Sequence, residues 1–397
     1  MRMDLLRATA AVTAASALLV TGFVTLRRSE PIATAQPAVT LPSAEIAIVA
    51  TAHDGGARTS ELRVVAIDAK GTHETTLATI AHAPGAVLRG DALHGQAAFV
   101  VAADDERDRA LYDFGSTLWR VARVGASDGS VKELARGLYH ASRPLASKDG
   151  AVYVERGKAG AWPSALEIKA GRLRVDALAI DAIDPETGAS RTVYTGSGYT
   201  LHLAGEYGAE LVVYRVDSSG ADLLAVDRAT GRSRLVATLP PFARDFSIDE
   251  ARGAIVMSNR DESDAHLWIV ARVDLASGGM TLLASERDDA PAPFALPGGA
   301  MAWTASGRRG LSLRASASSL GASDARLLAP LGAGFDAVTH ASTDATWITI
   351  AHVPPGDGAY DVSAAVHVAS GTPVRLTTRD ERVEVLGFVG GDGGGAR

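Results

Sequence analysis

The feature that most constrains the fold is a heptapeptide that occurs twice in the chain. Residues 118–124 read LWRVARV and residues 267–273 read LWIVARV, so six of the seven positions are identical. Each copy follows an acidic stretch, at 105–108 and at 261–264, and precedes a turn and another short apolar segment. Self-similarity on this scale is typical of proteins built from repeated structural units. The unit that repeats is therefore larger than one strand.

Hairpin patterns like these two recur along the rest of the chain. They occupy residues 62–77, 178–193, 223–236, 311–328 and 364–376, which makes seven with the first pair. Upstream of most of them lie two more apolar segments split by a turn, as at 244–248 and 254–258. Four strands in a unit of about 45 to 60 residues are typical of a β-propeller blade.

Three of the hairpin turns share a pattern that begins with Asp and ends with Gly. Asp can cap a turn with its side chain, and Gly can adopt positive φ at little cost. The pattern therefore predicts tight turns between the third and fourth strands of these units. The turns lie at residues 184–188, 227–231 and 274–278.

The two ends of the repeat region predict how the ring closes. The first unit starts at 45–49 with only three strands, and 383–389 forms a surplus strand at the C-terminal end. If the surplus strand becomes the innermost strand of the first unit, the sheets close into a ring without an open edge. We therefore predict an all-β fold, a β-propeller of seven four-stranded blades over residues 43–389. Ala-rich segments leave six or eight blades open, and the Gly-rich tail 390–397 is predicted to be disordered.

The N-terminal segment predicts export or anchoring. Residues 8–26 carry no charge and are long enough to cross a bilayer, and basic residues flank the run on both sides. Residues 33–35 fit a signal-peptidase site, but Arg27 and Arg28 lie between it and the apolar run, which favours an uncleaved anchor. We assign residues 1–28 to a signal peptide or membrane anchor and 29–42 to a linker. Either interpretation places the remaining chain outside the cytoplasm, in the periplasm or cell envelope.

The fifth unit resembles the propeller repeats of TolB and of the prolyl-oligopeptidase propeller domain. The resemblance rests on residues 258–264, SNRDESD, leading into 267–270, LWIV. TolB-like proteins work in the periplasm as protein-binding scaffolds, and the resemblance implies such a role here. A weaker similarity links residues 182–188 and 225–231 to the repeats of pyrroloquinoline-quinone dehydrogenases and BamB-like scaffolds. The Trp of that family is replaced by Thr192 and Leu235, so we interpret these segments as structural turns.

Composition and motif context remove several kinds of chemistry. The chain has no Cys, which excludes disulfides, thiol catalysis and Cys-ligated metal, and its net charge of −7 disfavours nucleic-acid binding. Residues 125–129 match G-x-S-x-G, but they lie at a hairpin tip rather than between a strand and a helix. The ten histidines form no close pair, although His82, His140, His202 and His340 fall near the starts of inner strands and leave a central cluster open. We expect no cofactor and no metal.

The long connections between second and third strands are the candidate binding elements. They cover residues 103–116, 155–175 and 353–362, whereas connections between first and second strands are short. Recognition usually resides in loops on a rigid scaffold, with aromatic and Arg side chains as anchors. The candidate binding residues are Arg107, Arg109, Tyr112, Asp113, Phe114, Arg156, Lys158 and Trp162.

No feature of the sequence requires catalysis. We therefore predict a non-catalytic extracytoplasmic propeller that binds an envelope protein or surface ligand through its long-loop face, with membrane contact through the N-terminal segment only. The alternative is an extracytoplasmic enzyme, a hydrolase or quinoprotein, with its site in the central channel.

Overall fold

The computed structural model divides the chain into two compact units, Met1–Thr40 and Leu41–Arg397, of which only the second contains described residues. The described residues are 41–390 except 54–55, 85, 87, 94–96, 103–118, 126–129, 139–141, 157–178, 197–199, 218–219, 241–242, 262, 288–290, 306–310, 317–325, 333–334 and 354–361. The predicted anchor 1–28, nearly all of the linker and the tail from 391 lie outside them. Within the described ranges, no helix has the length and apolar character needed to cross a bilayer.

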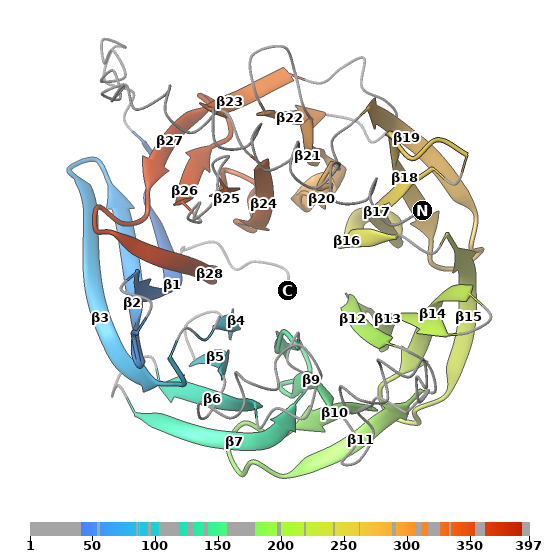
Figure 1. Cartoon of the computed structure of the whole chain (residues 1–397), viewed down its shortest axis with the longest axis horizontal. Coiled ribbons are helices and arrows are strands. Elements are labelled where there is room, and N and C mark those ends of the chain that lie inside the picture. Colours follow the sequence, from blue (N-terminus) through green and yellow to red (C-terminus); the bar gives the residue numbers. More distant parts are fainter. Residues whose placement is uncertain are drawn as a thin grey trace, which may run out of the picture. The chain divides into compact units, whose positions relative to one another are not determined.

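Five separate four-stranded antiparallel sheets account for most of the second unit (Figure 1). In order from the centre outward, they are β28 (Glu381–Gly390), β1 (Ala44–Ala52), β2 (Thr59–Asp68) and β3 (Gly71–Ala81); β12 (Thr200–Tyr207), β13 (Glu210–Asp217), β14 (Gly220–Asp227) and β15 (Ser233–Leu239); β16 (Arg244–Asp249), β17 (Ala254–Arg260), β18 (Leu267–Asp274) and β19 (Met280–Arg287); β20 (Phe294–Ala295), β21 (Met301–Ala305), β22 (Leu311–Ser316) and β23 (Arg326–Gly332); β24 (Phe335–Ala341), β25 (Trp347–Val353), β26 (Val362–His367) and β27 (Thr372–Arg375). Two short 3-10 helices, η1 (Glu250–Arg252) and η2 (Pro297–Gly299), lie in turns.

The remaining strands form one eight-stranded sheet. Its first half contains β4 (Arg89–Leu93), β5 (Ala97–Ala102), β6 (Trp119–Gly125) and β7 (Val131–Leu138), and its second half contains β8 (Leu145–Ala146), β9 (Val152–Arg156), β10 (Ala179–Ile183) and β11 (Ser190–Thr195). Each half has the strand order of the other sheets. The halves are joined where Leu138 of β7 pairs with Arg156 of β9.

The all-β propeller prediction is confirmed, but the predicted count of seven separate four-stranded sheets is wrong. Five sheets are separate, and the other eight strands make a single sheet. The physical reason is the backbone pairing of Leu138 with Arg156, which continues one hydrogen-bonded ladder across the junction between the two halves. Such pairing depends on where strand ends meet in space, and no local sequence pattern encodes it.

The predicted closure by the C-terminal strand is confirmed. β28 pairs antiparallel with β1, from Glu45 opposite Gly390 to Ala52 opposite Glu381, and lies on the inner side of the ring (Figure 1). An element from the end of the chain thus completes the sheet that begins the ring.

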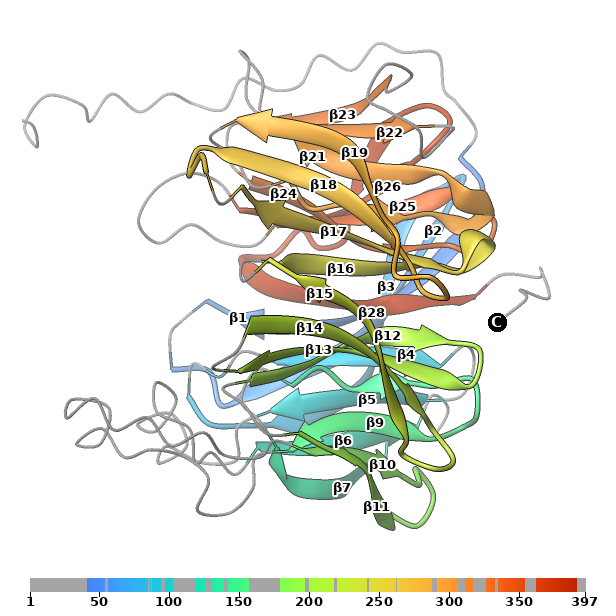
Figure 2. The same ribbon diagram turned by 90° about the vertical axis from the view of Figure 1, so that its right-hand side faces the viewer.

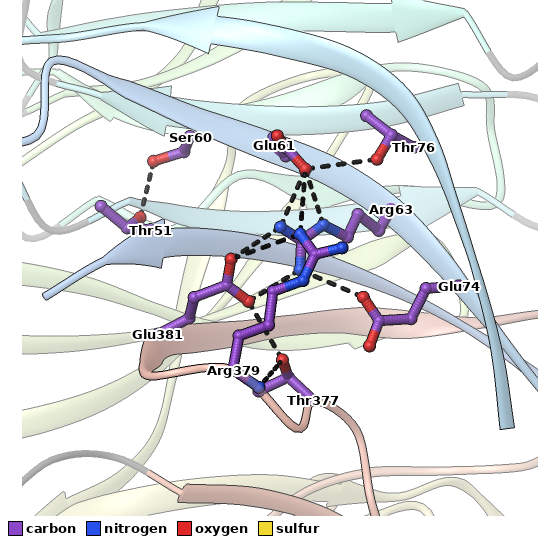
Figure 3. A network of polar contacts seen from close by, with 9 residues as sticks. All are labelled: Thr51, Ser60, Glu61, Arg63, Glu74, Thr76, Thr377, Arg379 and Glu381. Carbon is purple, nitrogen blue, oxygen red and sulfur yellow. Dashed lines mark hydrogen bonds and ion pairs between the residues drawn. The ribbon is translucent and has the colours of Figure 1, made fainter.

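A buried arginine fastens this closing strand (Figure 3). Arg63 of β2 is buried, and its two terminal nitrogens donate to the two carboxylate oxygens of Glu381, each at 2.7 Å. It also donates to Glu61 at 2.8 Å and to Glu74 at 3.2 Å. The hydrogen bonds with Glu381 raise the pKa of Arg63, and the same bonds lower the pKa of Glu381. A fork-to-fork pair of this kind fixes both position and orientation.

The three predicted Asp-to-Gly turns are confirmed, and each also packs against the outer strand of the preceding unit of the ring. The Asp Oδ1 atoms accept backbone N–H groups two or three residues later. The terminal glycines have φ of 76°, 70° and 72°. A Cβ on these glycines would lie 3.3, 2.4 and 2.0 Å from a carbonyl oxygen of the preceding outer strand. The pairs are Gly188 with Leu134, Gly231 with Val193 and Gly278 with Val236.

The core lies between neighbouring sheets. For example, Ile255 and Met257 of β17 pack in one buried cluster with Val212 of β13 and Leu223 of β14. Alternate residues of each middle strand therefore face the two adjacent sheets, as the period of a β-strand requires.

Candidate functional site

The antiparallel strand order gives the ring two different faces (Figure 2). Turns between first and second strands and between third and fourth strands emerge on one side, which we call the turn face. Connections between second and third strands and between successive sheets emerge on the opposite side, the loop face. In Figure 2 the turn face lies to the right. The two longest intervals between a second and a third strand, 103–118 and 157–178, both belong to the loop face.

Both of these intervals start and end on the eight-stranded sheet. Residues 103–118 connect β5 to β6, and residues 157–178 connect β9 to β10. The Leu138 and Arg156 pair that joins the two halves lies at the loop-face ends of β7 and β9. The structure therefore brings the ends of the two candidate binding connections onto one sheet.

Arg156 is the candidate binding residue that the described ranges include. Its Nε lies 2.5 Å from Oδ2 of Asp181 on β10, and Asp181 is buried and also accepts a hydrogen bond from Thr192 at 2.9 Å. Arg156 thus has a structural ion pair at the base of its connection. The other seven candidates lie outside the described residues, namely Arg107, Arg109, Tyr112, Asp113, Phe114, Lys158 and Trp162.

A second group of polar side chains lies on or beside the inner strands, and of its members the sequence analysis considered only His340. We call Asp91, Arg143, His340 and Glu384 the axial cluster. They belong to β4, the residues before β8, β24 and β28, respectively. The sequence signal for these residues is a polar side chain in or next to a predicted inner strand. Polar side chains also occur at many turns, so this signal does not single the four residues out.

Asp91 links two inner strands and is poised to titrate near neutral pH. Its Oδ1 accepts the N–H of Ala92 at 2.9 Å, and its Oδ2 accepts the N–H of Ala146 on β8 at 2.8 Å. Burial raises the pKa of Asp91 to about 7, and the charge of Glu206 adds to this, while the two N–H groups and Arg143 act in the opposite direction.

His340 and Arg143 complete the axial cluster. The Nδ1 atom of His340 is buried and has no hydrogen-bond partner. Burial lowers the pKa of His340 to about 4, and the positive charge of Arg143 contributes, so the imidazole is neutral at pH 7. Arg143 lies 3.6 Å from the carboxylate of Glu384. A Cβ on Gly387 of β28 would lie 3.8 Å from His340 Cδ2 and 3.9 Å from Ala92 Cβ, which places β28 between β24 and β4.

The histidines considered for a central cluster have separate surroundings. His82 bonds to Ser60 at 2.8 Å and to the carbonyl of Ala83 at 2.8 Å, and His202 lies 3.4 Å from Glu155. His140 lies outside the described residues. Among the residues that the structure describes, no group of three or more His, Asp or Glu side chains is arranged to hold a metal ion.

Comparison with known proteins identifies the architecture. No family model and no curated protein matches the chain. A putative 6-phosphogluconolactonase from Bacteroides fragilis superposes with a TM-score of 0.53 at 10% identity, covering 87% of this chain and 98% of that one. A prolyl endopeptidase superposes with a TM-score of 0.53 at 14% identity, covering 86% of this chain and 50% of that one. TolB from Acinetobacter baumannii gives 0.48 at 11% identity, over 87% and 67% of the two chains.

The shared fold is the β-propeller. The predicted resemblance to prolyl-oligopeptidase propellers is thereby confirmed at the level of fold. The chain spans half the length of the prolyl endopeptidase. Propellers host both binding proteins and enzymes, so function has to be argued from the residues of this chain.

Proposed function

We propose that this propeller is an extracytoplasmic scaffold that binds an envelope protein or a surface ligand at its loop face. The observation that carries the proposal is that the two longest connections, 103–118 and 157–178, start and end on one eight-stranded sheet. Pairing of Leu138 with Arg156 ties the two halves of this sheet together at their loop-face ends. Two connections on one rigid support can act as a single recognition surface.

Contacts between sheets support the rigidity that such a surface needs. In two places a side chain of one sheet accepts the backbone N–H of an inner-strand residue in the next, and in a third place the bond joins the two halves of the eight-stranded sheet. Glu155 accepts from Leu203 and Ser247 from Ala295 between sheets, and Asp91 accepts from Ala146 between the halves. These bonds occupy N–H groups of inner edge strands and hold neighbouring units of the ring in register.

The extracytoplasmic location rests on the apolar run 8–26 and its flanking arginines. Fractionation of cells that express the full chain, with mass determination of the mature protein, tests it. A protein in the envelope fraction, either intact or shortened near residue 35, is the expected result. A full-length protein that stays in the cytoplasm contradicts the proposal.

Crosslinking and affinity capture from envelope fractions test the binding role. The intact chain is compared with a variant in which Tyr112, Phe114 and Trp162 are changed to Ala. The control variant is Tyr207→Ala, because Tyr207 is an exposed aromatic residue at the turn-face end of β12. We expect the same partner with the intact chain and the control and its loss in the triple variant. Equal capture by all three proteins contradicts the assignment of the surface.

The axial cluster supports a second candidate function, an enzyme with its site in the central channel. The supporting observation is Asp91, whose carboxyl pKa of about 7 suits a general acid or base. The positive charge of Arg143 also acts on this carboxyl group and lowers its pKa. Turnover of a panel of lactones and esters tests it. Activity that is lost in Asp91→Asn and kept in the triple loop variant supports the enzyme, and absence of turnover by the folded protein on the panel counts against this hydrolase.

A further inference from the structure

Several of the described ion pairs of the loop face share one orientation. In five of them the arginine side chain is 37–64% exposed, whereas the carboxylate side chain is only 2–33% exposed. In each pair the guanidinium is the more exposed member. The pairs are Arg143 with Glu384, Arg156 with Asp181, Arg244 with Asp245, Arg287 with Asp264, and Arg379 with Glu381.

Other loop-face pairs mark the limits of this pattern. Asp380 beside His53 is more exposed than the histidine, Arg215 and Asp222 are about equally exposed, and Arg63 is buried among its carboxylates. The described ion pairs of the turn face show no common orientation. The acidic partner is more exposed in the pair of Lys148 with Glu250, whereas the basic partner is more exposed in the pairs of Arg234 with Glu210 and Arg252 with Asp249. Among the described ion pairs, outward arginines over recessed carboxylates are therefore more numerous on the loop face, although the whole chain carries a net charge of −7.

One of the outward arginines is held in place over an aromatic ring. Arg244, the first residue of β16, has its Cζ 5.9 Å from the ring centre of Trp268, within the range of a cation–π contact. Its Nε donates to Asp245 Oδ2 at 2.7 Å, and the same oxygen accepts from Ser258 at 2.9 Å. The arginine is thus fixed by both an anion and an aromatic face.

Asp245 holds this arrangement with an unusual backbone conformation. Its φ is 54°, in the left-handed region that residues other than glycine rarely adopt, although Asp tolerates it better than most. Strained residues of this kind persist where the surrounding contacts determine them, and they are found often at binding sites. On β19, the outermost strand of the same sheet, Arg287 donates to Asp264 at 2.8 Å and is the most exposed of the five arginines.

We infer that the loop-face end of the sheet β16–β19 binds acidic segments of a partner protein, with Arg244, Arg287 and Trp268 as anchors. The inference rests on the proposed binding function and specifies the chemistry of the partner. A carboxylate of the partner can share an outward guanidinium with the recessed carboxylate of this chain, and Trp268 offers apolar contact next to it. A dense polyanion fits less well, because the recessed acids lie beneath every arginine and the chain as a whole is acidic.

Fluorescence anisotropy with defined peptides tests the inference. The full chain is titrated into a labelled octapeptide of alternating glutamate and serine, a matched peptide of lysine and serine, and a short DNA duplex. The variants are Arg244→Gln, Arg287→Gln, their combination, and Trp268→Leu. Arg234→Gln is the control, because Arg234 is a comparably exposed, paired arginine on the turn face. Thermal melting checks that each variant is folded.

We expect the glutamate peptide to bind and the lysine peptide not to bind. Each single Arg variant is expected to weaken binding by roughly fivefold, the double variant by more, and Arg234→Gln by less than about twofold. Equal binding of the two peptides overturns the inference, as does an equal loss in Arg234→Gln. DNA that binds as tightly as the glutamate peptide, through the same arginines, also overturns it in favour of polyanion recognition.

The capture experiment and the peptide titration test different claims, so their failures can be told apart. If the peptide binds as expected but the triple variant Tyr112, Phe114 and Trp162 to Ala captures the same proteins as the intact chain, the inference holds and the proposed surface is wrong. If capture depends on those residues but the glutamate peptide does not bind, the scaffold function holds and the acidic partner is ruled out.

Discussion

Charged side chains have different partners on the two faces of this propeller. On the turn face, arginines that pair with carboxylates also donate to backbone carbonyls of the adjoining sheet, as Arg234 does to Leu275 at 2.8 Å and Arg252 to Gly299 at 2.6 Å. On the loop face, the outward arginines pair with recessed carboxylates and keep a large part of their surface in solvent. The first arrangement joins sheets to one another, and the second leaves charge available to a partner. The comparison teaches that the same residue type stabilises the ring on one face and, in the binding role proposed above, is available to a partner on the other.

Arg63 is expected to produce the largest effect, because it is the loop-face arginine that points inward. Arg63→Met leaves Glu61, Glu74 and Glu381 close together without their shared cation. Breaking a buried ion pair costs about 3 to 5 kcal/mol of unfolding free energy, and we expect about 4 kcal/mol here. Urea unfolding at pH 7 measures it. A loss below about 1 kcal/mol shows that the closing strand does not depend on this arginine.

Substitution of a turn-face glycine is expected to cause the next largest loss of unfolding free energy. In Gly278→Ala the new Cβ would lie 2.0 Å from the carbonyl oxygen of Val236, at a φ of 72°. Gly208→Ala is the matched control, with a φ of 58° and open space around the Cβ. We expect a loss of about 3 kcal/mol for the first and about 1 kcal/mol for the second, since only the first adds a clash to backbone strain. If urea unfolding gives equal losses for Gly278→Ala and Gly208→Ala, the turn at Gly278 does not pack tightly against the carbonyl oxygen of Val236.

Asp91 predicts how stability depends on pH. Burial raises its pKa to about 7 from the ordinary value of 3.8, so the folded protein keeps a proton that the unfolded chain releases. The contribution of this group is therefore fully present below about pH 4, declines as the pH rises to about 7, and is constant above that. We expect a decline of roughly 2 kcal/mol in the intact protein relative to Asp91→Asn. If the unfolding free energies of the intact protein and Asp91→Asn change in parallel between pH 4 and 8, the burial of this carboxyl group is contradicted.

Arg143 is expected to produce the smallest change in stability. Its guanidinium is half exposed and lies 3.6 Å from Glu384, a residue on the same strand as Glu381. Exposed pairs contribute about 0 to 1 kcal/mol, so Arg143→Met is expected to cost less than about 0.5 kcal/mol, and salt should reduce the effect further. A loss as large as that of Arg63→Met shows that the outward and inward arginines of the loop face contribute equally to stability.

Most of the fold could be predicted because its signals are local. Alternating apolar residues predict strands, and Asp-to-Gly turns such as 227–231 predict hairpins, because both depend on the preferences of a few consecutive residues. The surplus strand, β28, could be assigned to the innermost position of the first sheet, because that position completes the sheet and leaves the ring without an open edge. The candidate binding residues on 103–118 and 157–178 were chosen by the same local reasoning, from aromatic and Arg side chains in long connections.

The sequence by itself determined the strands, the turns and the closure of the ring at the C-terminal strand. Only the tertiary structure decided which sheets merge, which arginines point outward, and which acids are buried. Arg63 and Glu381 are 318 positions apart, and Leu138 meets Arg156 only because two strand ends coincide in space. The physical reason is that burial and pairing depend on neighbours from other sheets, whereas strand and turn preferences reside in the segment itself.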